Sequence, residues 1–315
     1  MNVTNVLPKD AIPSIDDPEF GVDYLGDADD DAVVLGDDPP KAYPVRVLNF
    51  HEIVNGVVDG TPVAVTWCPL CGSAVAYERR VDGRTLEFGV SGKLADDDLV
   101  MYDRETGSEW KQSLGACIAG ELEGAELTVL PASVTSVGAF RDRHPDGVVL
   151  QPADAESEAA SDTDDPAPVD YGDDPYESYF DREGFGLAAH RGVDGGRSWD
   201  RGDDLDAKTV VLGLERGGDA LGFPVSRVAD AGGVATAAVG GEPAVVFATA
   251  DGVHAFADPG YEFAPTEDGF EADGATWNGA TGESADGRSL ERLPARRLFA
   301  FAWQDDHGAD AFWSP

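Results

Sequence analysis

Residues 63–80 read VAVTWCPLCGSAVAYERR, and this stretch decides the fold class. Two apolar runs flank a turn that contains Pro69 and Gly72, residue types that favour tight turns. Short runs of the same kind, each bounded by Gly, Pro or Asp-Gly, recur as AVVLG, TLEFGV, LTVLP, TVVLGL, AVVFATA and RLFAFAW. Runs rich in Val, Thr and aromatic residues are typical of strands. The chain is therefore predicted to be mainly β, with few short helices.

Local signals predict two further elements. Val81-Asp82-Gly83 lies between the runs 74–80 and 84–90, and Asp-Gly at such a tip predicts a hairpin. Residues 45–53 carry a loose helical periodicity of apolar residues, which predicts one short helix. No helix of twelve or more residues is expected.

Short motifs in the first part of the chain return in the second part in the same order. The pairs are VVLG (33–36) with VVLG (210–213), YPV (43–45) with FPV (223–225), GTP (60–62) with GEP (241–243), and Trp110 plus Leu130-Pro131 with Trp277 plus Leu293-Pro294. This order predicts an internal duplication that gives two related β-rich halves, barrel- or sandwich-like. Residues 151–175 are rich in Asp, Glu, Ala, Ser and Pro, which predicts an acidic flexible linker. The expected domains are 1–150, with the cysteine motif, and 176–315, without cysteines.

The charge of the chain restricts its partners. Asp and Glu number 61 against 22 Lys and Arg, so the formal net charge is −39. Such a surface repels phosphate backbones and anionic lipids, so neither nucleic acid nor membrane is expected as a partner. Only five Lys and a pI near 4.1 indicate the salt-rich cytosol of a halophile, and an ordinary acidic protein is the alternative. No signal peptide or membrane-spanning segment is visible, so a cytoplasmic protein is expected.

The strongest chemical signal is the Cys68-Pro69-Leu70-Cys71 turn. The leading hypothesis is a redox-active dithiol, in which the more exposed sulfur attacks and the other resolves the intermediate, with an unknown redox partner or small molecule as substrate. A metal site is the alternative, since two Cys on a two-residue spacer can hold zinc or another transition metal. The third hypothesis is a non-enzymatic module whose buried thiols only pack. The matching stretch of the second half, residues 247–252, has no sulfur, which favours chemistry confined to the first half.

His51 is the best candidate to assist the two cysteines. A thioredoxin-type motif opens a helix that lowers the thiol pKa, whereas a strand follows Gly72 here, so a nearby cation such as His51 would have to favour the thiolate. As a metal ligand, either His51 or Cys117 would complete a site with Cys68 and Cys71. A purely structural hydrogen bond is the alternative for His51.

Asp96-Asp97-Asp98 is a second motif with potential ligands. Three consecutive carboxylates could hold a hard cation such as Ca²⁺. In a chain this rich in Asp, a solvated acidic loop is the favoured interpretation.

Several longer motifs resemble one protein family. They are PSIDDP (13–18), AYP (42–44), LNFHEIVN (48–55), PVAVTWCPLCGSA (62–74), FGVSG (88–92), DLVMYDR (98–104), HPD (144–146) and DPYESYF (174–180). Together they make the chain similar to the Domain of Unknown Function 3179 (DUF3179) family, as a haloarchaeal member, over about residues 11–225. The resemblance implies no established activity. Cys117 lies outside the family pattern, so the resemblance gives it no catalytic role.

Overall fold

The computed structural model describes residues 1–161, 163, 165–201 and 204–315. Strands hold 41% of the residues and helices 14%, which confirms the mainly β prediction. The six α-helices in the described ranges have at most eight residues, and none of the described helices is long and apolar enough to cross a membrane. They are α1 (Val45–His51), α2 (Val137–Arg143), α3 (Glu177–Asp181), α4 (Gly186–Arg191), α5 (Val225–Asp230) and α6 (Ala300–His307).

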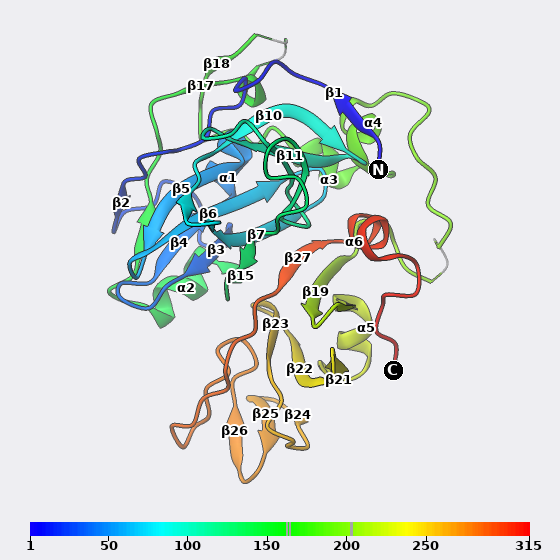
Figure 1. The fold of residues 1–315 in the computed structure, drawn as a ribbon. Helices are drawn as coiled ribbons and strands as arrows, with labels where there is room; N and C mark the ends of the chain where they lie inside the picture. Colours follow the sequence, from blue (N-terminus) through cyan, green and yellow to red (C-terminus); the bar gives the residue numbers. More distant parts are fainter. Residues whose placement is uncertain (162, 164, 202–203) are drawn as a thin grey trace.

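The largest sheet runs between the two parts of the molecule (Figure 1). Its strand order is β20 (Asp219–Pro224), β19 (Val210–Arg216), β27 (Arg296–Phe299), β7 (Ser73–Glu78), β6 (Thr61–Cys68) and β5 (Ile53–Val58), with β14 (Thr128–Val129) also paired to β7. β27 meets β7 at the pair Arg297↔Ala74. Strands from both sides of residues 151–175 therefore share one sheet, while the domain boundaries stay a prediction.

Two five-stranded sheets complete the first half. One has the order β1 (Val3–Asn5), β10 (Phe88–Ala95), β11 (Asp98–Asp103), β12 (Glu109–Lys111) and β13 (Ala116–Ala119). The other has the order β15 (Ser133–Ser136), β3 (Asp31–Leu35), β4 (Lys41–Pro44), β16 (Val148–Leu150) and β2 (Phe20–Gly21). The first of these sheets carries Asp98 on β11 and Lys111 on β12, two side chains of the candidate site described below.

Smaller sheets form the rest of the molecule. The second half contains β21 (Val234–Val239), β22 (Glu242–Thr249) and β23 (Gly252–Ala257), and a distal sheet of β24 (Ala264–Thr266), β25 (Gly269–Ala272) and β26 (Ala275–Trp277) (Figure 1). Two-stranded ladders join β17 (Glu156–Ser157) to β18 (Ala167–Pro168) and β8 (Arg80–Val81) to β9 (Arg84–Thr85). A single 3₁₀ turn, Glu158–Ala160, follows β17.

The two elements predicted from local signals are confirmed. α1 covers 45–51 of the predicted 45–53, and its Val47, Leu48 and Phe50 are buried. The hairpin at Asp82-Gly83 is present as the pairs Arg80↔Thr85 and Val81↔Arg84, shorter than the flanking runs suggested. The segments before and after this hairpin belong to different sheets, because β7 pairs with β6 whereas β10 pairs with β11.

The two halves follow the same succession of elements. β3, β4, α1, β5, β6 and β7 correspond in order to β19, β20, α5, β21, β22 and β23. The register differs by two residues from the sequence match, since Tyr43 faces Val33, the first residue of its VVLG motif, whereas Phe223 faces Leu212, the third. An internal duplication would produce the shared order of elements, and the duplication itself stays a prediction.

Candidate functional site

The cysteine turn joins two paired strands of the central sheet, as the sequence predicts. Cys68 ends β6 and faces Ser73 at the start of β7. Gly72 adopts φ +54°, and a Cβ atom on it would lie 2.7 Å from the ring of Phe299. The Phe299 amide donates a hydrogen bond of 2.7 Å to the carbonyl oxygen of Cys71. Strand β27 of the second half therefore holds the turn from one side.

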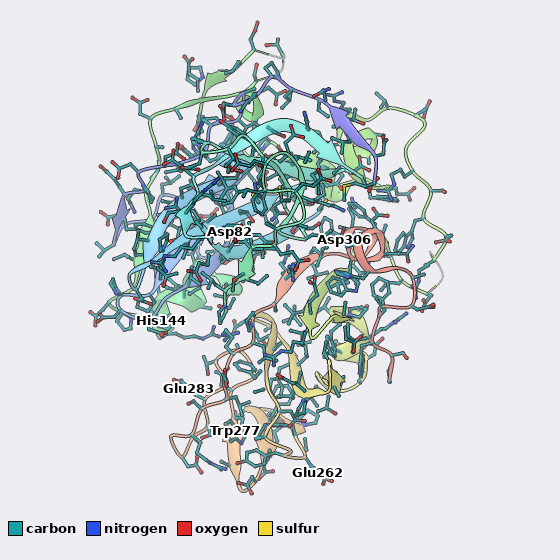
Figure 2. All side chains as sticks on the ribbon, viewed as in Figure 1. Asp82, His144, Glu262, Trp277, Glu283 and Asp306 are labelled. Carbon is teal, nitrogen blue, oxygen red and sulfur yellow. The ribbon has the colours of Figure 1, made fainter. Side chains whose placement is uncertain are left out.

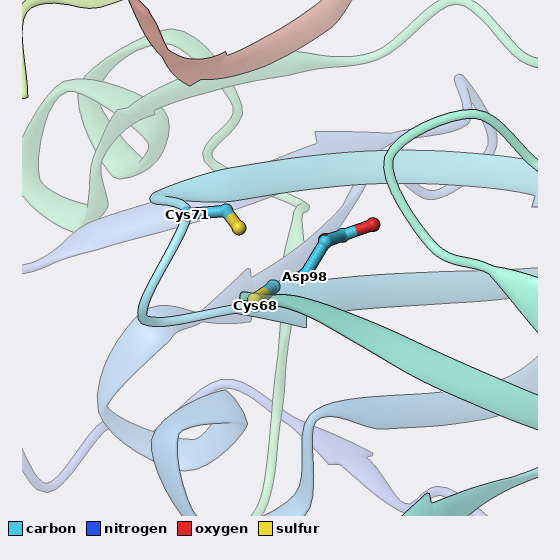
Figure 3. Close-up of side chains that lie close together, drawn as sticks. All are labelled: Cys68, Cys71 and Asp98. Carbon is cyan, nitrogen blue, oxygen red and sulfur yellow. The ribbon is translucent and has the colours of Figure 1, made fainter. Parts of the chain in front are cut away.

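Asp98 joins the two cysteines in one buried cluster. Cys68 Sγ, Cys71 Sγ and a carboxylate oxygen of Asp98 all lie within 4.8 Å of one another (Figure 3). The exposed fractions of the three residues are 2%, 0% and 1%. Asp98 reaches this place because Ala95 pairs with it across a two-residue turn whose members, Asp96 and Asp97, have positive φ. The prediction of a solvated loop is therefore wrong for Asp98, because only Asp96 and Asp97 lie in the turn and Asp98 is the first residue of β11.

The two oxygens of Asp98 have unequal surroundings. Oδ2 accepts a hydrogen bond of 2.9 Å from the amide of Ser113, whereas buried Oδ1 has no hydrogen-bond partner in the described ranges. Burial raises the pKa of Asp98 to about 6, although the charge of Lys111 works in the opposite direction. A buried carboxylate oxygen without a donor is costly, so this atom marks a place where a cation would be favourable.

A buried ion pair lies near Asp98 and interacts with its charge. Lys111 on β12 bonds Asp306 of α6, and their side chains are 2% and 1% exposed (Asp306 is labelled in Figure 2). Ser113 Oγ donates to the second oxygen of Asp306 at 2.6 Å. Burial lowers the pKa of Lys111, but the negative charges of Asp306 and Asp98 have the larger effect, so the pKa is raised overall. The charges of Lys111 and Asp306 cancel, so the buried group of Lys111, Asp306 and ionised Asp98 has a net charge of one negative unit.

The surroundings of both thiols favour the protonated form. Burial is the largest cause that raises the pKa of Cys68 and of Cys71, and the charge of Asp98 raises both further. Cys71 Sγ donates to the carbonyl oxygen of Asp97 at 3.3 Å. The charge of Lys111 works in the opposite direction at Cys71, but burial outweighs it, so both thiols favour the protonated rather than the reactive form.

A cavity of about 90 Å³ lies beside Cys68, with room for water or a very small molecule. Its wall is mostly apolar and also includes Glu52 and Tyr176. Glu52 caps the C-terminus of α1 with φ 56°, and its carbonyl oxygen accepts a bond of 2.8 Å from the Trp67 amide. Burial raises the pKa of Glu52 to about 8, with Glu158 and Asp98 as further causes.

His51 lies in a different network from the cysteines. Nδ1 is 2.8 Å from the carbonyl oxygen of Pro13 and Nε2 is 2.7 Å from the hydroxyl of Tyr171. Burial lowers the pKa of His51. His51 is not part of the Cys68–Cys71–Asp98 group. Its roles as a catalytic residue or metal ligand stay predictions, and both ring nitrogens already have partners.

Cys117 also lies outside the group. It sits on β13 opposite Trp110, and its Sγ is 3.5 Å from the carbonyl oxygen of Ala119. Of the predicted residues, the structure brings together Cys68 and Cys71.

The sequence analysis named Asp98 only as part of an acidic loop and did not join it to the cysteines, and it gave Glu52 no role. For Asp98 a local signal exists, because a two-residue hairpin turn in Ala95-Asp96-Asp97-Asp98-Leu99 places the third Asp in a strand. The position of Glu52 follows from the end of α1, where the chain reverses after His51.

A family model described as a protein of unknown function, DUF3179, matches residues 9–310. The chain belongs to this family. No curated protein and no solved structure matches the chain. The DUF3179 match includes both halves, so it covers Asp306 of α6 as well as the cysteine turn.

Proposed function

We propose that this DUF3179 protein binds one thiophilic divalent metal ion, such as zinc, through Cys68, Cys71 and Asp98. Sulfur and carboxylate oxygen are both ordinary zinc ligands. The single observation that carries the proposal is the Asp98 carboxylate: one of its oxygens lies within 4.8 Å of both sulfurs, and its buried Oδ1 has no donor among the described residues. Because a metal ion accepts a lone pair, it would satisfy this oxygen, which no donor among the described residues reaches.

The charge balance of the cluster also supports a metal. A divalent ion that replaces two thiol protons leaves the net charge of the buried group unchanged. By contrast, a lone thiolate would add a second negative charge beside Asp98, where burial already raises the thiol pKa. An ion removes this obstacle because it stabilises both thiolates at once.

Three protein ligands leave one position of a tetrahedral ion free, which is the pattern of catalytic rather than structural zinc sites. The cavity beside Cys68 would admit water or a very small molecule to that position. Glu52 lines the same cavity, as do Glu158 and His190, and its raised pKa makes it our candidate for proton transfer to such a ligand. A small-molecule reaction at a metal centre is therefore the activity that we favour.

A dithiol is the second candidate, and the proximity of the two sulfurs favours it. Oxidation would form one sulfur–sulfur bond and release two protons and two electrons to an external acceptor, either a disulfide or a peroxide. Cys68 lines the cavity, so a small oxidant would reach it before Cys71.

Metal analysis and thiol titration of the full chain, purified under anaerobic conditions, test both candidates. We expect one metal ion per chain, and a thiolate-to-cobalt absorption band after exchange with Co²⁺. Cys68→Ser, Cys71→Ser and Asp98→Asn should lose the ion, whereas Cys117→Ser, a buried cysteine outside the group, should retain it. A chain that binds neither Zn²⁺ nor Co²⁺ but forms a reversible Cys68–Cys71 disulfide would overturn the metal proposal in favour of the dithiol. If it does neither, the cysteines only pack.

A further inference from the structure

Arg292 is a cation without an acidic partner in a chain with 61 Asp and Glu. Its Nη1 donates to His254 Nδ1 at 3.3 Å, and its Nη2 donates to the carbonyl oxygen of Ala280 at 2.6 Å. Its guanidinium also lies 4.7 Å from the ring centre of Phe256. All three partners are uncharged, and no carboxylate in the described ranges forms an ion pair with Arg292. Its positive charge is therefore uncompensated.

The neighbouring histidine cannot share this charge. His254 Nε2 lies 3.1 Å from the carbonyl oxygen of Asp251, so it is the protonated nitrogen, and Nδ1 is left to accept from Arg292. Burial and the charge of Arg292 lower the pKa of His254 to about 3. Burial and the nearby Arg143 also lower the pKa of Arg292 to about 10, which still leaves the guanidinium charged at neutral pH.

Arg292 lines a cleft of about 700 Å³ between the two halves. The first half contributes residues 34–37, 58, 59, 61, 63, 130–133 and 135 and the end of α2, and the second half contributes residues 280, 281, 283 and 292. His144 and Glu283, labelled in Figure 2, belong to opposite walls of this cleft. Arg143 lines it as well, but this side chain is paired with Asp251. Among the described residues that line this cleft, Arg292 is therefore the cation that remains available to a ligand.

Thr135 supplies an independent sign of a ligand. Its side chain is 5% exposed, lines the same cleft, and carries a buried hydroxyl without a hydrogen-bond partner among the described residues. Ser133, two residues earlier on strand β15, lies on the same face and also lines the cleft. A buried hydroxyl without a partner is unusual, and an acceptor from a bound molecule would satisfy it.

The acidic groups of the cleft restrict the kind of anion. Asp37, Asp59 and Glu283 also line it, and Asp37 and Glu283 act on the pKa of His144. A doubly charged phosphate would be repelled by these groups more strongly than a singly charged anion. A carboxylate matches the planar fork of a guanidinium.

We propose that the cleft between the two halves binds a small carboxylate, with the Arg292 guanidinium and the Thr135 hydroxyl as its anchoring donors. This site is separate from the proposed metal centre, and neither proposal depends on the other. It joins residues of both halves, so the ligand would bridge them.

Titration of the full chain with sodium acetate, in place of sodium chloride at constant ionic strength, tests this proposal. The readout is the Nε–Hε signal of Arg292 in ¹H–¹⁵N spectra, identified by its absence in Arg292→Lys. We expect a saturable shift with acetate. Thr135→Val, which removes an unpartnered hydroxyl without a change of shape, should weaken acetate binding about tenfold. Arg288→Gln, which alters an arginine already paired with Asp273 and Asp286, should leave it unchanged.

Three results would overturn the proposal. One is the absence of a saturable shift when acetate replaces chloride. Another is tighter binding of inorganic phosphate than of acetate, since it would assign the cleft to a different anion. The third is equal acetate affinity in Thr135→Val and the unaltered chain, because Thr135 would then not contact the ligand.

Discussion

At the scale of single residues, ionised Asp98 is expected to destabilise the metal-free fold and to favour metal binding. Its pKa of about 6 is above the ordinary value of 3.8, so the folded chain binds a proton that the unfolded chain releases between these pH values. The metal-free fold is therefore expected to lose stability as pH rises from about 4 to about 6. A bound ion would reverse this penalty because it pairs with the charged form.

The substitution Asp98→Asn separates these two effects. The metal-free variant should be more stable than the unaltered metal-free chain at pH 7, by up to about 3 kcal/mol, because it carries no buried charge. The same variant should lose the metal. Urea unfolding after chelation, at pH 4 and at pH 7, measures the first effect. Equal stabilisation at both pH values would contradict the assignment to Asp98 ionisation.

Glu52 gives a second pH-dependent prediction in a higher window. Burial raises its pKa to about 8 from 4.5, so stability should fall as pH rises from about 4.5 to about 8. Glu52→Gln should remove this decline and stabilise the fold at pH 8 by up to about 4 kcal/mol. Thermal unfolding at pH 5 and pH 8 provides the comparison. The exposed Glu262→Gln is a suitable control, and it should leave the slope unaltered.

At the scale of elements, the cysteine turn depends on contact with a strand from the other half. Gly72 has φ +54° and lies against Phe299 of β27, so an added methyl group meets both backbone strain and a ring. Gly72→Ala is therefore expected to cost about 2–4 kcal/mol and to lower metal occupancy. Gly83→Ala is the matched control, since Gly83 also has a positive φ of +77° but nothing within 4 Å of the added atom.

Urea unfolding and metal analysis of both glycine variants make this comparison. The control should lose about 1 kcal/mol, the cost of the left-handed backbone alone, and should keep its metal. Equal losses in the two variants would mean that the contact with Phe299 does not support the site.

Elements fixed by local chemistry could be predicted from the sequence, and those fixed by distant contacts could not. Pro69 and Gly72 predict the cysteine turn, and Asp82-Gly83 predicts the hairpin, because each turn is decided within four residues. The pair Lys111–Asp306 joins residues 195 positions apart and leaves no local signal. His51 and Glu52 are adjacent, yet the end of α1 directs them to different surroundings, and the sequence does not fix that direction.

The two halves share an order of elements but differ in the length of one turn. Cys68 and Ser73 enclose a four-residue turn, whereas the corresponding pair Thr249↔Gly252 encloses only Ala250 and Asp251. The longer turn of the first half makes room for Cys71 beside Cys68. This difference is in accord with a metal site in one half and an anion site shared between the halves.

At the scale of the whole molecule, the net charge of −39 has to be reconciled with a compact fold. Most basic side chains in the described ranges pair with surface carboxylates, as Arg104 does with Asp10, Asp16 and Glu87. These exposed pairs contribute little each, and salt weakens them. The larger effect is repulsion among unpaired carboxylates, which salt also screens.

We propose that this protein is adapted to high salt, and its stability should therefore rise with KCl. The screening length falls from about 10 Å at 0.1 M to about 3 Å at 1 M, so most repulsion between carboxylates disappears over this range. Thermal unfolding followed by circular dichroism should give a higher Tm at 2 M than at 0.1 M KCl. Sucrose, which stabilises by exclusion without screening, should raise the Tm similarly at both salt concentrations. A Tm that falls or stays constant with KCl would contradict the adaptation, because the loss of ion pairs would then equal or exceed the relief of repulsion.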